Sequence, residues 1–192
     1  MVRPRKFDAD DALDRAIAVF SKRGYDGAST TALLTEMHIS RQSLYGAFGD
    51  KKHLYLTALQ RYAAGNVAEM IRVMNAERSP LQGIEAGLLS IVSRPERKVA
   101  TTCMAVSAAS EFGQSDPQVT LILNASGRTL LSAFEDLLSR AKNAGEVAAD
   151  VDVCEAAHFL RATLNGMKVG SRGGMDSQTL CAVVRMTLRS LR

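Results

Sequence analysis

The stretch HISRQSLYGAFGDKKHLY, residues 38–55, contains two helix breaks separated by about two helical turns. The triplet HIS interrupts the apolar spacing of the residues before it, and Ser40 is a residue type that caps helix N-termini. Gly49 and Asp50 interrupt the second helix, after which a longer helix can begin. Two short helices joined by a tight turn, behind a supporting helix, form a helix-turn-helix motif. The stretch therefore predicts this motif near the N-terminus.

The residues before this stretch predict the two helices that would support it. Asp8 can cap a first helix, which Lys22, Arg23 and Gly24 would end. The apolar positions of that helix recur at spacings of three and four: Leu13, Ala16, Ile17 and Phe20. Ser29 or Thr30 can cap a second, short helix.

The rest of the chain also reads as helix, because its apolar residues recur at spacings of three and four rather than two. A long helix is expected from Asp50 to about Glu77. Breaks near residues 78–80, 93–97, 115–117, 143–146 and 170–174 divide the remainder into about five further helices. With 192 residues, of which 46% are hydrophobic, the chain can bury a substantial core. The predicted fold class is all-α.

Composition favours a soluble protein of the cytoplasm. No apolar run approaches the roughly 18 residues of a membrane span, and the N-terminal MVRPRKFDADD has no apolar signal core behind it. The cysteines at positions 103, 154 and 181 are odd in number and far apart, which is typical of free thiols in a reducing compartment.

An enzyme is not expected, and neither is a cofactor or a metal. His38, His53 and His158 are isolated in the sequence, and the chain contains no His-Glu-x-x-His, no phosphate-binding glycine loop and no Gly-x-Ser-x-Gly elbow. The net charge of +4 permits a nucleic-acid partner without requiring one. The placement of individual residues has to decide that question.

The second helix of the motif has one apolar side and one polar side. At about 100° per residue, Leu44, Ala47 and Phe48 fall between roughly 240° and 340°, whereas Arg41, Gln42, Tyr45 and Gly46 fall between roughly 0° and 140°. Arg and Gln have the geometry to address guanine and adenine edges in the major groove, and Ser and Tyr hydroxyls suit phosphates. The predicted contacts of this helix with duplex DNA are Ser40, Arg41, Gln42, Ser43, Tyr45 and Gly46. Gly46 is included because a missing side chain permits close approach to DNA.

Further DNA contacts are predicted around the motif, although each position also has an ordinary structural explanation. Lys51 can hold a phosphate or simply be solvated, and Thr30 and Thr31 can contact the backbone or cap their helix. Arg3, Arg5 and Lys6 form a basic arm of the kind that follows a minor groove.

These residues together resemble the N-terminal domain of TetR-type transcriptional repressors, the TetR/AcrR family. The pattern is a glycine-aromatic helix end (Gly24-Tyr25), a threonine pair (Thr30-Thr31), a serine-capped recognition helix with Leu-Tyr near its end, and Phe-x-x-Lys-x-x-Leu from Phe48 to Leu54. The resemblance implies recognition-helix roles for Ser40, Arg41, Gln42 and Tyr45, and phosphate contacts for Thr30 and Lys51. Gly46 and Ala47 are smaller than the family's usual residues.

The resemblance also implies about nine helices in two domains. Residues 1–49 would form a three-helix DNA-binding domain with its basic arm, and residues 50–192 a helical effector-binding and dimerisation domain. Candidate residues for the effector pocket are apolar or small: Met70, Met74, Leu88, Ile91, Cys103, Met104, Ser107, Phe112, Leu121 and Phe134. Methionines suit varied ligands, but at helical spacing they are also ordinary core residues.

The last two helices are rich in apolar residues and, by the resemblance, would form a homodimer. The predicted interface residues are Phe159, Leu160, Thr163, Met167, Leu180, Val184, Thr187, Leu188 and Leu191. The same residues can instead pack within their own domain. Small residues such as Ala162 and Gly166 permit close approach of helices in either case.

The predicted function is that of a homodimeric, sequence-specific DNA-binding transcriptional regulator. It would be a repressor released from a palindromic operator by an unknown small-molecule effector. Two alternatives stay open. One is a helical scaffold that binds a ligand or a protein without binding DNA. The other is a thiol-based regulator that senses electrophiles through Cys103, which is near a helix start where the dipole favours a thiolate.

Overall fold

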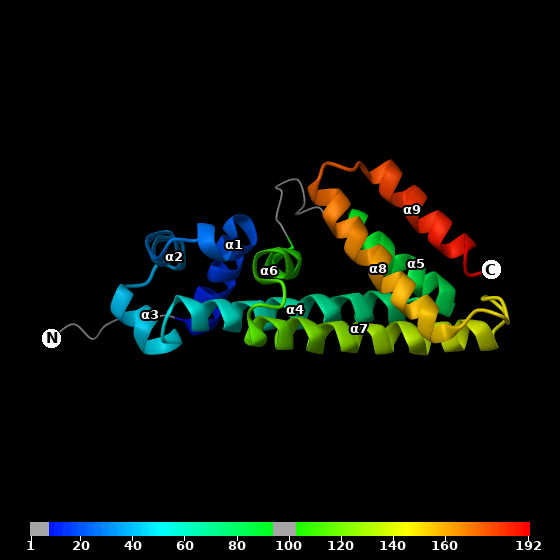
Figure 1. Cartoon of the computed structure of the whole chain (residues 1–192), viewed down its shortest axis with the longest axis horizontal. Coiled ribbons are helices and arrows are strands. Elements are labelled where there is room, and N and C mark those ends of the chain that lie inside the picture. Colours follow the sequence, from blue (N-terminus) through cyan, green and yellow to red (C-terminus); the bar gives the residue numbers. More distant parts are fainter. Residues whose placement is uncertain (1–7, 94–102) are drawn as a thin grey trace. The chain divides into compact units, whose positions relative to one another are not determined.

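The computed structural model describes residues 8–93 and 103–192. Within these ranges the chain is helical and contains no strand, so the all-α prediction is confirmed. The described helices, labelled in Figure 1, are α1 (Ala9–Gly27), α2 (Thr30–Met37), α3 (Arg41–Phe48), α4 (Lys51–Asn75), α5 (Pro80–Ser93), α6 (Met104–Phe112), α7 (Pro117–Asn143), α8 (Val153–Arg172) and α9 (Ser177–Arg189).

Short polar side chains set the starts of the first three helices. Asp8 Oδ1 accepts a hydrogen bond from Asp10 N–H at 2.9 Å and Ser40 Oγ accepts one from Ser43 N–H at 3.0 Å, so both predicted caps are confirmed. At α2 the cap is Ser29, whose Oγ accepts from Ala32 N–H at 3.1 Å. These bonds satisfy N–H groups that have no partner within the helix.

The turn of the motif lies at His38. This residue has left-handed backbone angles, φ 55° and ψ 40°, and its N–H group donates to the carbonyls of Leu34 and Thr35. Ile39 N–H also donates to Leu34 O, at 3.3 Å. Two donors folded back onto the last turn stop α2, and Ser40 then starts α3 in a new direction.

Contacts divide the chain into two compact units, each with its own core. Among the described residues, the first unit comprises residues 8–63 and 103–123, and the second comprises residues 64–93 and 124–192. The helices α4 and α7 therefore each contribute residues to both units. The predicted boundary between a DNA-binding domain (residues 1–49) and an effector-binding and dimerisation domain (residues 50–192) divides the chain by function and stays a prediction.

The core of the first unit joins α1, α2 and α3 to the first part of α4 and to α6. Phe20, Leu33, Leu44 and Leu59 are each at most 1% exposed within it. Met104 and Ala108 bring α6 into the same cluster, and α6 packs against α1. The helices that present the motif therefore share one core with a helix about 60 residues further along the chain.

The core of the second unit gathers apolar side chains from α5, α7, α8 and α9 with the second part of α4. Leu88, Phe134, Leu138, Leu160 and Leu164 are fully buried there. The α8 and α9 helices lie side by side as a hairpin, seen in orange and red in Figure 1. In the described ranges, no helix combines the length and the apolar character that a membrane span requires.

Candidate nucleic-acid interface and effector domain

The α3 helix presents its polar residues to solvent because Leu44, on its other side, packs into the core of the first unit. Leu44 is 1% exposed in the core of the first unit, whereas Arg41, Gln42 and Tyr45 are exposed. Tyr45 is 52% exposed, which is unusual for a large aromatic side chain in a protein's own fold. The structure thus brings the predicted base-reading residues together on one open face.

Ser40, the N-cap of α3, and Ser43 within that helix lie together at the start of this face. Ser40 Oγ accepts from Ser43 N–H, and the two hydroxyl oxygens lie 2.9 Å apart within hydrogen-bond range. Thr31 is exposed and Thr30 is half-buried at the start of α2, where Ser29 rather than either threonine caps the helix. The threonine hydroxyls are therefore not used in capping, and their DNA contacts stay predictions.

Gly46 has no structural role in the protomer that would exclude a side chain. A Cβ atom built there would meet no atom of the described chain within 4 Å. We expect Gly46→Ala to raise the free energy of unfolding by about 0.5–1 kcal/mol, because Ala is the better helix former. The same change should weaken operator binding about fivefold if α3 approaches DNA closely at this point. Thermal melting and DNA titration measure the two effects, and a gain in stability with unchanged affinity would contradict the close approach.

Lys51 begins α4, three residues after the end of α3, and its side chain lies against an aromatic ring. Lys51 Nζ lies 4.4 Å from the centroid of the Tyr25 ring, at the distance of a cation–π contact. The Lys51 side chain is half-buried. Lys52, its neighbour, is committed elsewhere, because its Nζ pairs with the carboxylate of Asp116. The basic-arm residues Arg3, Arg5 and Lys6 lie outside the described residues.

Comparison with known proteins decides the family. Residues 12–58 match the model described as bacterial regulatory proteins, tetR family, and residues 80–186 match the tetracyclin repressor-like C-terminal domain. The chain belongs to the TetR family. Its members are transcriptional regulators, and both the helix-turn-helix prediction and the family prediction are confirmed.

Similar TetR-family proteins span nearly the whole chain. The uncharacterized HTH-type transcriptional regulator YezE of Bacillus subtilis is 33% identical over 164 residues, 83% of this chain and 84% of its own. The HTH-type transcriptional repressor ComR of Escherichia coli is 24% identical, with 97% of this chain and 90% of its own covered. One similar solved structure is a cysteine-substituted form of the TetR family regulator CifR, complexed with 26-bp operator DNA. It is 34% identical to this chain, covers 99% of this chain and 100% of that one, and superposes with a TM-score of 0.86.

The predicted pocket residues of this TetR-family chain do not all come together. Met70, Met74, Leu88, Ile91 and Phe134 belong to the core of the second unit, whereas Met104 and Phe112 belong to that of the first. Ser107 is buried on α6, and Leu121 is 66% exposed. Cys103 is half-buried at the N-cap position of α6 and makes no capping hydrogen bond through its side chain.

A small cavity in the second unit includes two of the predicted residues. It measures about 40 Å³ and is lined by Asn66, Val67, Met70, Ser90, Ile91, Leu130 and Lys168. Met70 and Ile91 were predicted. The polar residues Asn66, Ser90 and Lys168 were missed, because a search for apolar stripes passes over them. A mixed lining of this kind suits a ligand with one polar end.

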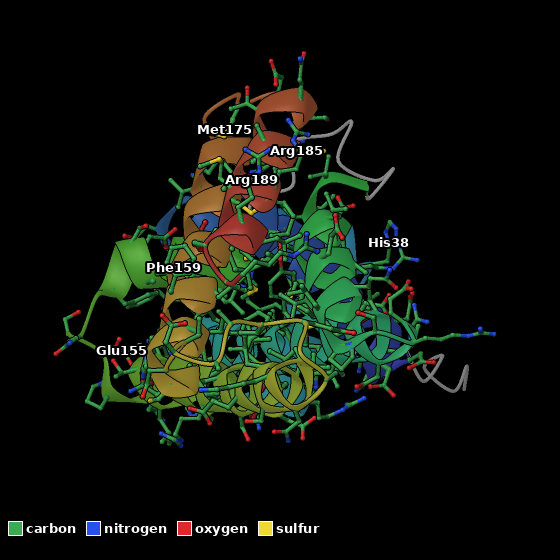
Figure 2. The ribbon with its side chains drawn as sticks, turned by 90° about the vertical axis from the view of Figure 1, so that its right-hand side faces the viewer. His38, Glu155, Phe159, Met175, Arg185 and Arg189 are labelled. Atoms are coloured by element: carbon green, nitrogen blue, oxygen red, sulfur yellow. The ribbon has the colours of Figure 1, made fainter. Side chains whose placement is uncertain are left out.

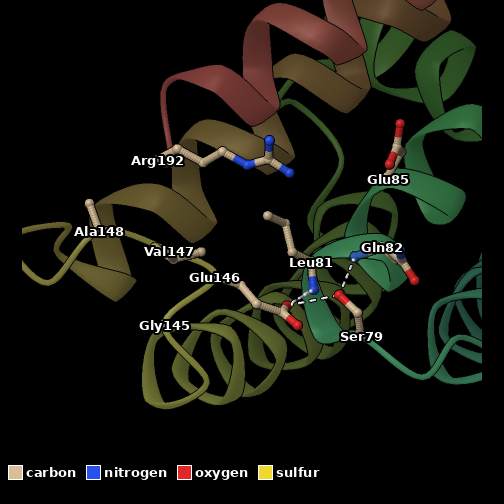
Figure 3. Close-up of a pocket in the computed structure, with 9 residues that line it drawn as sticks. All are labelled: Ser79, Leu81, Gln82, Glu85, Gly145, Glu146, Val147, Ala148 and Arg192. Carbon is tan, nitrogen blue, oxygen red and sulfur yellow. Dashed lines mark hydrogen bonds between the residues drawn. The ribbon is translucent and has the colours of Figure 1, made fainter.

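A second, more open cleft of about 540 Å³ lies where α5 begins (Figure 3). Its best-defined contacts are structural, since Glu146 Oε2 accepts from Ser79 Oγ and from Leu81 N–H, each at 2.9 Å. Glu146 thereby caps the start of α5 from the loop after α7. Sequence reasoning missed this cap, because the two partners are 65 residues apart.

Most of the predicted interface residues are already buried within the protomer. Seven of the nine have 7% or less of their surface exposed: Leu160, Met167, Leu180, Val184, Thr187, Leu188 and Leu191. Such residues have almost no area left to offer a partner. Phe159, at 44% exposed, and the half-buried Thr163 are the exceptions.

The open face of the α8–α9 hairpin is a different stripe of the same helices. On α8 the stripe consists of the exposed residues Glu155, Phe159, Ala162, Gly166 and Val169, spaced by four and three residues; Cys154, His158 and Asn165 are also exposed on this helix. On α9 they include Arg185, Met186 and Arg189, of which Met186 is 61% exposed. Figure 2 looks onto this hairpin and shows Phe159 on α8, with Arg185 and Arg189 on α9. We call this stripe the open hairpin face.

Proposed function

We propose that this TetR-family regulator acts in the cytoplasm as a homodimeric repressor, released from a two-fold symmetric operator by a small-molecule effector. The single observation that carries the DNA-binding half of the proposal is the exposed face of α3. Arg41, Gln42 and Tyr45 share that face, and buried Leu44 fixes its orientation. A recognition helix needs such a rigid, outward-facing polar side.

The dimer would form through the open hairpin face. Phe159, Val169 and Met186 expose 44%, 53% and 61% of their surface. Large apolar side chains gathered on one exposed face are typical of a surface that binds another protein. Ala162 and Gly166 lie between the larger residues of α8 and would let a partner helix approach closely. Two-fold pairing would bring this same stripe of each protomer together.

The effector would enter the second unit at the cavity lined by Met70 and Ile91. Its walls combine four apolar side chains with Asn66, Ser90 and Lys168, as ligand sites commonly do. At about 40 Å³ the cavity is smaller than a drug-sized ligand. The adaptable Met70 side chain would therefore shift when a ligand is bound.

Selection of bound sequences from random duplex DNA tests the proposal directly. We expect a two-fold symmetric site whose half-sites lie about one helical turn apart, because each protomer supplies one α3 helix. Binding to the selected site should weaken steeply as salt rises, with a slope that counts the phosphates contacted. A scaffold without DNA function would enrich no sequence and show no steep salt dependence. Enrichment of a single asymmetric half-site would contradict the dimer but not the DNA binding.

A further inference from the structure

Two acidic side chains of the first unit contact α1 and α4, the helices that support α3, although neither belongs to the predicted DNA contacts. Glu111 is in the last turn of α6, and Asp116 directly precedes α7. Glu111 Oε2 accepts a hydrogen bond from Tyr25 N–H at 2.7 Å, across 86 residues of sequence. Asp116 forms an ion pair with Lys52 in the first turn of α4, and this pairing lowers the pKa of the Asp116 carboxyl.

The break in α1 at Gly24 is built around Glu111. Gly24 has a positive φ of 70° inside the helix, and a Cβ atom placed on it would lie 1.9 Å from Glu111 Oε1. A backbone N–H at such a break needs an acceptor outside the regular helical ladder. Glu111 supplies that acceptor to the Tyr25 N–H. The missing side chain at Gly24 leaves room for the Glu111 carboxylate, and the carboxylate satisfies the N–H group that the bend exposes.

The Tyr25 side chain connects this bend to the proposed phosphate contact. Its ring centroid lies 5.0 Å from that of Tyr55 and 5.4 Å from that of Phe112, and it carries Lys51 Nζ at 4.4 Å on its face. Lys52 Nζ lies 4.4 Å from the Phe112 centroid. Lys51 therefore lies on the ring of Tyr25, which Glu111 and Phe112 of α6 contact. Lys52 lies on the ring of Phe112 and pairs with Asp116, the residue before α7.

We propose that Glu111 and Asp116 are positioning residues for operator binding: without touching DNA, they hold the end of α1 and the start of α4 so that Lys51 meets a phosphate. The inference rests on the proposed phosphate contact of Lys51. The positioning role predicts a change in operator affinity opposite in sign to the one that charge alone would cause. Removing a negative charge near DNA strengthens binding through charge alone, whereas loss of positioning weakens it.

The experiment compares Glu111→Gln with Glu111→Met in the full chain, using anisotropy titration of the selected operator. Both variants remove the charge, but only Gln keeps an oxygen that accepts from Tyr25 N–H. We expect Met to bind about tenfold more weakly than wild type and Gln to stay within about twofold. Met binding as tightly as wild type, or Gln binding as weakly as Met, would overturn the positioning role of Glu111.

The matched control is Asp26→Asn, which removes a neighbouring charge. The Asp26 side chain is exposed and makes no hydrogen bond or ion pair with the part of the chain that the structure describes, so the operator affinity of the Asp26→Asn variant should stay within about twofold of wild type or rise. A loss as large as that of Glu111→Met would overturn the inference. Wild-type binding itself tests the proposed function, whereas the ratios of variant to wild type test the positioning role.

Two further measurements keep the test decisive. In a Lys51→Ala background, Glu111→Met should cause little additional loss of affinity, because both changes act on one phosphate contact, and full additivity would overturn the link.

If Glu111→Met does not fold, the Asp116→Asn variant is used in its place. Asn still accepts from Gln118 and Val119 N–H at the start of α7 and loses only the ion pair with Lys52. We expect about fivefold weaker binding, and equal or tighter binding would overturn the role of Asp116.

Discussion

Gly166→Arg is expected to leave the protein folded but monomeric, and to lower its operator affinity by at least about a hundredfold. In the protomer a Cβ atom at Gly166 meets no described atom within 4 Å, so the arginine can extend into solvent. In the proposed dimer the same side chain would stand where α8 approaches its partner. A monomer would hold only one half-site and lose the avidity that two linked recognition helices provide.

Light scattering after size exclusion measures the mass, and DNA titration measures the affinity. Gly65→Arg is the matched control, because Gly65 is also an exposed helical glycine with no described atom within 4 Å of its Cβ position. The control should remain dimeric and bind DNA as wild type does. A dimeric, fully active Gly166→Arg protein would place the interface elsewhere than the open hairpin face.

Four alanine substitutions on and beside α3 should divide into two classes. Arg41→Ala and Gln42→Ala are expected to weaken binding by roughly 10- to 100-fold and to relax the preference for one base pair each, because such side chains read base edges. Tyr45→Ala and Lys51→Ala should weaken binding to all sequences alike, and Lys51→Ala should reduce the magnitude of the salt slope by about one.

Titration of each variant against the selected operator and its single-base variants, at several salt concentrations, separates the two classes. Melting temperatures should stay near that of wild type, since Arg41, Gln42 and Tyr45 are exposed. If all four variants bind the operator as wild type does, α3 is not the reading helix.

Local signals predicted the motif well because its helix ends depend on neighbouring residues. Asp8 and Ser40 cap helices through hydrogen bonds that span two or three positions, and Leu44 is the apolar residue that faces the core. Such contacts are visible in a short window of sequence. The end of α1 was less predictable: the bend at Gly24 was expected to stop the helix, yet α1 resumes and continues to Gly27.

Periodicity could not choose between the two apolar sides of α8 and α9. Leu160 and Phe159 are adjacent and both apolar, but one is fully buried in its own protomer and the other is 44% exposed. Only the packing of the neighbouring helices separates them. The pocket prediction met the same obstacle, since Met70 and Met104 look alike in sequence but lie in different cores.

The sequence by itself therefore determined the all-helical fold, the helix-turn-helix motif, and the bounds and polar face of its second helix, because capping and helical spacing act over a few residues. Only the tertiary structure decided which stripe of the last two helices stays open and which polar residues line the cavity near Met70. It alone brought Glu111 to the bend at Gly24. Each of these depends on residues tens of positions apart meeting in a packed core, and no local pattern encodes that meeting.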